Sequence, residues 1–181
     1  MPIHIIAFAG SLRRNSFNRG LLRAAADLLS GDVSLEIVEI SEIPLFNKDI
    51  ENPFPEPVQV FRDKVQAADA LLIATPEYNH SIPGVLKNAL DWGSRAPNVF
   101  SSKPLAILGA GGHFGTTRAQ YHLRQVATAL NMFAVTAPQV LVFDAKSKFD
   151  ENGNLQDEET RPYIKRLLEA LFDLTRRLKT P

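Results

Sequence analysis

The sequence contains no cysteine, and this one absence removes several classes of protein. Disulfide bonds, iron–sulfur clusters, zinc sites built from thiolates and cysteine nucleophiles are all excluded. A chain without disulfides fits a reducing compartment, and we expect a cytoplasmic protein. The N-terminus agrees with this expectation, because it enters an apolar run at Ile3 without the basic segment and long apolar stretch of a secretory leader.

No sign of charge is in excess either. Lys plus Arg and Asp plus Glu both number 20, so the formal net charge is zero. Proteins that coat nucleic acid or anionic membranes usually carry a basic surplus, and we expect neither partner. No apolar run approaches the roughly 20 residues that span a bilayer, so no membrane insertion is expected. The four histidines are scattered without an H-E-x-x-H pattern, and we expect no metal site.

The 181 residues are 45% hydrophobic and 22% charged, which predicts a single globular domain over residues 1–181. Short apolar runs alternate with helical patterns along the chain. Strands are predicted at Ile3–Ala9, Val33–Val38, Ala70–Thr75, Leu105–Leu108 and Gln139–Phe143. Because these runs are unbroken rather than alternating, they indicate a parallel five-stranded sheet with helices on both faces. Ligands of such sheets bind beyond the carboxyl ends of the strands.

The loop after the first strand, residues 10–18, is rich in groups that bind anions. It offers two hydroxyls, a guanidinium, an amide and the backbone N–H groups of a helix N-terminus, from Ser11, Arg13, Ser16 and Asn18. The alternative is a capped loop in which Ser16 only begins the helix and the arginines are solvated. Neither G-x-G-x-x-G after this strand nor a G-x-x-x-x-G-K-[ST] motif is present, which favours a terminal phosphate over a pyrophosphate.

The loops after the third and fourth strands predict a site for a flat ring. Residues 75–83 contain two prolines that hold the backbone amides in fixed directions, and Tyr78 or Asn79 can lie against a ligand. The alternative is a rigid connection that binds nothing. Residues 108–115 are rich in glycine, which lets the backbone approach a ligand closely. The third glycine falls one place too late for a dinucleotide motif, so this loop is weak support for NAD binding.

Three segments together resemble the NADPH-dependent FMN reductase family, which includes quinone and chromate reductases. They are residues 10–18, residues 76–79 with 86–92, and residues 120–125, and the likeness spans nearly the whole chain. The resemblance implies a flavodoxin-like three-layer sandwich with strand order 2-1-3-4-5. It also implies bound FMN, NAD(P)H as co-substrate, small-molecule electron acceptors and a homodimer or homotetramer.

The resemblance also implies which residues bind FMN. The first loop contributes the phosphate site, and the other two loops lie along the two sides of the ring. The implied residues are Ser11, Arg13, Ser16, Phe17 and Asn18, then Pro76, Glu77, Tyr78 and Asn79, and finally Ala110, Gly111 and Gly112. Ala110 stands where many relatives have a hydroxyl residue, so any contact with the ligand at this position must come from its backbone N–H.

We expect ping-pong transfer of two electrons, with hydride passing through flavin N5 and no catalytic side chain. Quinones, flavins, azo compounds and chromate are all chemically suitable acceptors. One alternative is a non-enzymatic electron carrier like the flavodoxins, although those are typically acidic and this chain is neutral. A second is a hydrolase or transferase acting on a phosphorylated substrate. Arg118 is a candidate partner for a 2′-phosphate of NADPH, and Trp92 is expected in the core or an interface.

Overall fold

The predicted alternation of strands and helices is present in the structure, a computed structural model that describes residues 2–179. The strands are β1 (Ile3–Ala9), β2 (Val33–Ile37), β3 (Ala70–Ala74), β4 (Pro104–Ala110), β5 (Phe133–Ala134) and β6 (Val140–Val142). The α-helices are α1 (Phe17–Asp27), α2 (Glu56–Ala67), α3 (Gly84–Gly93), α4 (Thr117–Ala129) and α5 (Arg161–Lys179). Two short 3-10 helices, η1 (Lys48–Ile50) and η2 (Ala145–Ser147), lie in the connections.

All strand pairs are parallel, and the order β2-β1-β3-β4-β5 confirms the predicted flavodoxin-like topology. The prediction of five strands needs one correction, because the edge position is shared by two short strands. β5 pairs with the start of β4 and β6 pairs with its end, where Leu108 lies opposite Val140. The predicted fifth strand corresponds to β6. The two residues of β5 are too few to give a periodic signal in the sequence.

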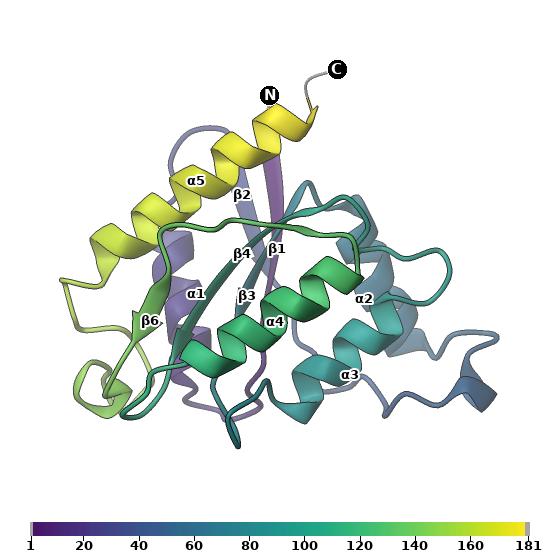
Figure 1. Cartoon of the computed structure of the whole chain (residues 1–181), viewed down its shortest axis with the longest axis horizontal. Helices are drawn as coiled ribbons and strands as arrows, with labels where there is room; N and C mark the ends of the chain where they lie inside the picture. The colour runs from purple at the N-terminus through teal and green to yellow at the C-terminus, as the bar shows by residue number, and fades with distance from the viewer. Residues whose placement is uncertain (1, 180–181) are drawn as a thin grey trace.

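Two apolar clusters lie on opposite faces of the sheet, as Figure 1 shows in the placement of the helices. Alternate residues of β1 point to opposite sides, so that Ala7 packs with α1 and α5 while Phe8 packs with α2, α3 and α4. Both faces are therefore buried, which is the reason why the strands read as unbroken apolar runs. Trp92 of α3 is fully buried and its indole N–H donates to the Pro44 carbonyl at 2.7 Å, which confirms its place in the core.

The carboxyl ends of β1, β3 and β4 meet at the lower edge of the sheet in Figure 1. Two hydrogen bonds extend the ladder just past these ends. The Gly10 N–H donates to the Ala74 carbonyl at 2.8 Å, and the Thr75 N–H donates to the Leu108 carbonyl at 3.0 Å. The three loops singled out in the sequence therefore leave the sheet side by side. Within residues 2–179, no helix has both the length and the apolar character needed to cross a bilayer.

Candidate functional site

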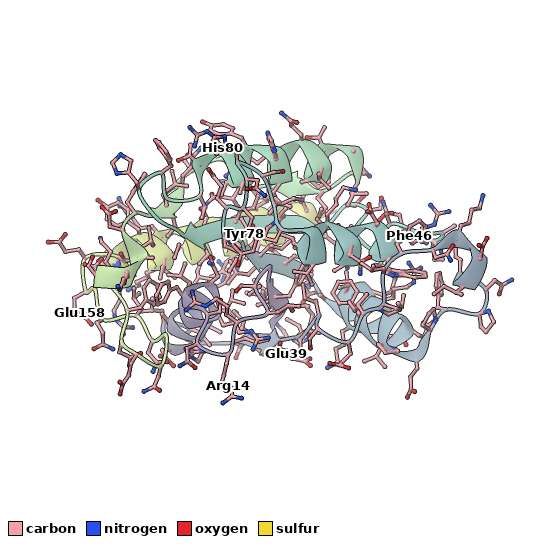
Figure 2. All side chains as sticks on the ribbon, turned by 90° about the horizontal axis from the view of Figure 1, so that it is seen from below. Arg14, Glu39, Phe46, Tyr78, His80 and Glu158 are labelled. Carbon is pink, nitrogen blue, oxygen red and sulfur yellow. The ribbon has the colours of Figure 1, made fainter. Side chains whose placement is uncertain are left out.

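A cavity of about 240 Å³ lies at this carboxyl edge, where the three loops converge. Seen from below in Figure 2, Tyr78 lies near the middle of the edge, with Arg14 toward the α1 side and His80 on the opposite side. Eleven of the twelve residues implied by the resemblance line the cavity, and Asn79 is the exception. The lining residues are Ser11, Arg13, Ser16, Phe17, Asn18, Pro76, Glu77, Tyr78, Ala110, Gly111 and Gly112, joined by Ala145 and Lys146.

The first loop brings unpaired donors to one end of the cavity. Ser16 caps α1, since its hydroxyl oxygen accepts from the Arg19 N–H at 3.4 Å. The capping role that the alternative gave to Ser16 is therefore present. Within the described residues, the backbone N–H groups of Phe17 and Asn18 have no protein acceptor, as is usual in the first turn of a helix. Arg13 lies 5.4 Å from the Phe17 ring and makes no ion pair among residues 2–179. Free N–H groups at a helix N-terminus beside an unpaired guanidinium are an arrangement that suits an anion.

Asn18 has a role that the sequence did not indicate. Its carboxamide pairs with the backbone of Ala110 in both directions, because Nδ2 donates to the Ala110 carbonyl and Oδ1 accepts from the Ala110 N–H, each at 2.9 Å. The β3–β4 register ends at Ala74 opposite Leu108, so the side chain takes the place of a strand beside Ala110. The Ala110 N–H expected to face a ligand is therefore already engaged. One N–H of the Asn18 carboxamide remains for a ligand.

Glu77 connects the second loop to helix α4. Its carboxylate accepts from the backbone N–H groups of Arg118 at 2.8 Å and Ala119 at 3.1 Å, and from the Arg118 guanidinium at 3.2 Å. A negative charge at a helix N-terminus is favourable, and this side chain is only 8% exposed. Arg118 also lies over the Phe114 ring at 4.5 Å. Glu77 therefore fixes the second loop to the start of α4 through its side chain.

The tip of the second loop explains why Asn79 does not line the cavity. The backbone groups of Tyr78 and Ser81 exchange two hydrogen bonds of 3.0 Å, and the two residues between them have positive φ angles of 50° and 63°. Such a two-residue turn requires positive φ at both central positions, and asparagine tolerates this conformation well. The sequence pattern predicted an ordered connection, and the structure has a hydrogen-bonded two-residue turn at its tip. It did not show that the turn places Asn79 at its tip.

Ala145 and Lys146 line the cavity but were missed in the sequence. They belong to η2, which is fastened to the glycine turn because the Ala145 N–H donates to the Gly111 carbonyl at 2.9 Å and the Asp144 N–H to the Gly112 carbonyl at 3.1 Å. One signal was available. A parallel strand next to β4 must end at the same edge of the sheet, so the residues after β6 had to come near this site.

The lining fits a ligand that carries a phosphate and a flat group. Hydroxyls, a guanidinium and free amides at the start of α1 are suitable partners for phosphate oxygens. Space for a close approach exists over Gly112, where an added Cβ would meet no atom within 4 Å. Among residues 2–179, no three His, Cys, Asp or Glu side chains gather in a group that could hold a metal ion.

Comparisons with known proteins agree with this geometry. A family model described as NADPH-dependent FMN reductase matches residues 3–146. An NAD(P)H-dependent FMN reductase of Pseudomonas aeruginosa is 48% identical over 180 residues, covering 98% of this chain and 97% of the relative. An NADPH:quinone oxidoreductase of Arabidopsis thaliana is 46% identical over 184 residues, covering 98% and 94%. Among solved structures, the flavoenzyme NAD(P)H:(acceptor) oxidoreductase FerB of Paracoccus denitrificans has a TM-score of 0.86 at 28% identity, covering 97% of this chain and 98% of that one.

Proposed function

Because this chain belongs to the NADPH-dependent FMN reductase family, we propose that it transfers two electrons from NAD(P)H to quinones in a ping-pong reaction. Family membership makes it an FMN-dependent oxidoreductase with NAD(P)H as co-substrate. The main support for the site is the cavity. Three loops that follow separate strands bring together eleven residues there, of the kinds that bind a phosphate and a flat ring.

Quinones are favoured as acceptors by the named activities of similar proteins. Besides the Arabidopsis enzyme, a 2-hydroxy-1,4-benzoquinone reductase of Burkholderia sp. is 43% identical over 172 residues. The cavity opens beside Tyr78, whose side chain is about half exposed. An aromatic ring at this position gives a flat acceptor a surface on which to stack. Flavins, azo compounds and chromate are further acceptors included in the proposal.

We assign the phosphate to Ser11, Arg13, Ser16 and the free amides of Phe17 and Asn18 at the start of α1. The ring is assigned to the backbone of Pro76, Glu77 and Tyr78 on one side and to the glycine turn with Ala110 on the other, with Asn79 only at the rim. FMN bound in this cavity would supply the two-electron hydride chemistry that links NAD(P)H to the acceptor. The protein holds the ligand at a fixed edge of the sheet and directs N–H dipoles toward it, which stabilises added negative charge. No side-chain acid or base is required.

The first test is the colour and composition of the purified full-length protein. We expect the absorption bands of oxidised flavin, released as FMN on denaturation. Combined replacement of Arg13 and Ser16 with alanine should abolish tight binding. Arg14→Ala serves as the control, since Arg14 does not line the cavity. A colourless protein that binds no added FMN, or a double variant that holds FMN as tightly as wild type, contradicts the proposal.

The second test separates the enzyme from an electron carrier. Steady-state oxidation of NADPH with a small quinone should give parallel double-reciprocal lines, as expected when the first product leaves before the acceptor binds. Intersecting lines contradict the ping-pong order, and absence of turnover favours the carrier. The similar proteins are named as reductases, which favours an enzyme over a non-enzymatic electron carrier.

Domain organisation, assembly and location complete the proposal. A single domain over residues 1–181 is supported by the one sheet that both apolar clusters share. A homodimer or homotetramer is supported by exposed aromatic side chains at Phe114 and Tyr121, each 54% exposed, and sedimentation analysis tests it. Cytoplasmic location is tested by cell fractionation.

A further inference from the structure

We propose that Lys146 provides a second positive charge to the phosphate end of the cavity and binds the ligand's phosphate together with Arg13. The inference rests on the proposed function, because it concerns the phosphate of FMN bound in the same cavity. Lys146 comes from η2, far along the sequence from the first loop, and belongs to none of the three segments that resemble the family. It is an additional ligand-binding residue for that site.

The position of Lys146 follows from how its segment is fastened at both ends. On one side, the backbone of η2 is hydrogen-bonded to Gly111 and Gly112, as described above. On the other side, Phe149 stacks on Phe17 with ring centroids 4.8 Å apart and an angle of 29° between the rings. Residues 144–149 therefore run from the glycine turn to the start of α1. Lys146 lies midway along this bridge and lines the same cavity as Arg13.

The turn that follows the bridge is held against the first loop by backbone contacts. The Asn15 side chain donates to the Glu151 carbonyl at 2.8 Å. An added Cβ on Gly153 would lie 2.8 Å from the Asn15 carbonyl carbon, and one on Gly20 would lie 1.8 Å from the Gly153 oxygen. The turn is therefore packed closely against α1 and the first loop. The Lys146 backbone is thus placed by the same elements that form the phosphate end.

The charges around the cavity favour an anion with two negative charges. Lys146 is exposed and has no carboxylate partner among residues 2–179, whereas Lys148, two residues on, is paired with Asp157 at 3.2 Å. Arg13 is likewise unpaired within that range. Glu77 is the one acidic residue among those that line the cavity, and Arg118 compensates its charge. The lining therefore keeps two uncompensated positive charges.

A phosphate monoester carries about 1.5 to 2 negative charges at neutral pH, which matches these two cations. Asp144 is the nearest acidic residue in the sequence. It lines, together with Lys146, a neighbouring cavity of about 470 Å³ but does not line this one, and no ion pair joins the two side chains. Arginine presents a planar fork to phosphate oxygens, while lysine acts as a mobile point charge on a flexible stem. Because both residues line the cavity, Arg13 and Lys146 can bind the same phosphate.

The test compares two flavins that differ only in the phosphate. Flavin-free full-length wild type, Lys146→Gln, Lys146→Arg and the control Arg14→Gln are titrated with FMN and with riboflavin, following flavin fluorescence. We expect Lys146→Gln to weaken FMN binding about tenfold, as for loss of one charge-assisted contact, and to leave riboflavin binding unchanged. Lys146→Arg and Arg14→Gln should stay within about twofold of wild type. Circular dichroism spectra should be the same for all four proteins.

Three results overturn the inference. FMN affinity unchanged in Lys146→Gln shows that the lysine does not bind the phosphate, and an equal loss for riboflavin shows that it acts elsewhere on the flavin. Where riboflavin binds too weakly to titrate, the salt dependence of FMN affinity decides: it should be shallower in Lys146→Gln than in wild type, and an equal slope contradicts the proposal. Wild type that binds no FMN refutes the proposed function itself, which is a distinct outcome.

Discussion

Replacing Asn18 with alanine separates a ligand-binding role of this residue from a structural one. The change removes two buried hydrogen bonds of 2.9 Å and leaves the N–H and carbonyl of Ala110 without partners. Unpaired buried groups cost about 1–3 kcal/mol each, and the better helix propensity of alanine offsets about 0.5 kcal/mol. We expect the free energy of unfolding to fall by about 2–4 kcal/mol. Urea denaturation of the flavin-free protein measures it without the contribution of bound ligand.

Asn15→Ala is the matched control, because it removes a single exposed hydrogen bond from the same loop. It should cost no more than about 1 kcal/mol. If Asn18→Ala unfolds at the same urea concentration as wild type, the pairing with Ala110 contributes nothing to stability. If stability is unchanged but FMN affinity falls, Asn18 acts on the ligand directly, as the resemblance alone implied.

Three further changes test other contacts of the site and the sheet. Glu77→Ala removes all three hydrogen bonds to the start of α4 and should lower the free energy of unfolding by about 2 kcal/mol. Glu77→Gln keeps an acceptor oxygen and should lose less stability. If wild type and both variants are equally stable in urea, Glu77 does not cap α4. Gly109→Ala would place a Cβ 2.3 Å from Thr116 Oγ1 and 2.4 Å from the Thr75 carbonyl oxygen, so its Tm should fall clearly, whereas the Tm of Gly84→Ala, whose Cβ meets nothing within 4 Å, should not. Burial raises the pKa of Asp69, but hydrogen bonds from Lys179 and the His4 N–H outweigh this and hold it below its usual value. The stabilisation by Asp69 is therefore present above about pH 4 and is lost as the pH falls through the folded-state pKa. The free energy of unfolding of Asp69→Asn, measured in urea, should be lower than that of wild type at pH 7, and this difference should shrink toward pH 3. A difference that stays constant with pH contradicts the assignment.

The order of strands and helices could be predicted because it depends on local patterns. Unbroken apolar runs such as Ile3–Ala9 indicate strands buried on both faces, and this alone implies a parallel sheet with two helical layers. β5 was not predicted because a strand of two residues is too short to show a hydrophobic pattern. The site could be placed at the carboxyl edge because parallel strands bring the loops after β1, β3 and β4 together whatever their lengths.

The family resemblance carried by the sequence also implied twelve residues for the site, and eleven of them line one cavity. The use of each polar group was decided only by the tertiary structure. The Asn18 carboxamide lies beside the end of β4, where β3 has already stopped, so it pairs with Ala110. The Glu77 carboxylate lies at the start of α4 and caps it. A hydrogen-bonding group satisfies the nearest partner in space, and long-range packing sets that distance, which is also why Lys146 could not be assigned to the site from its sequence position.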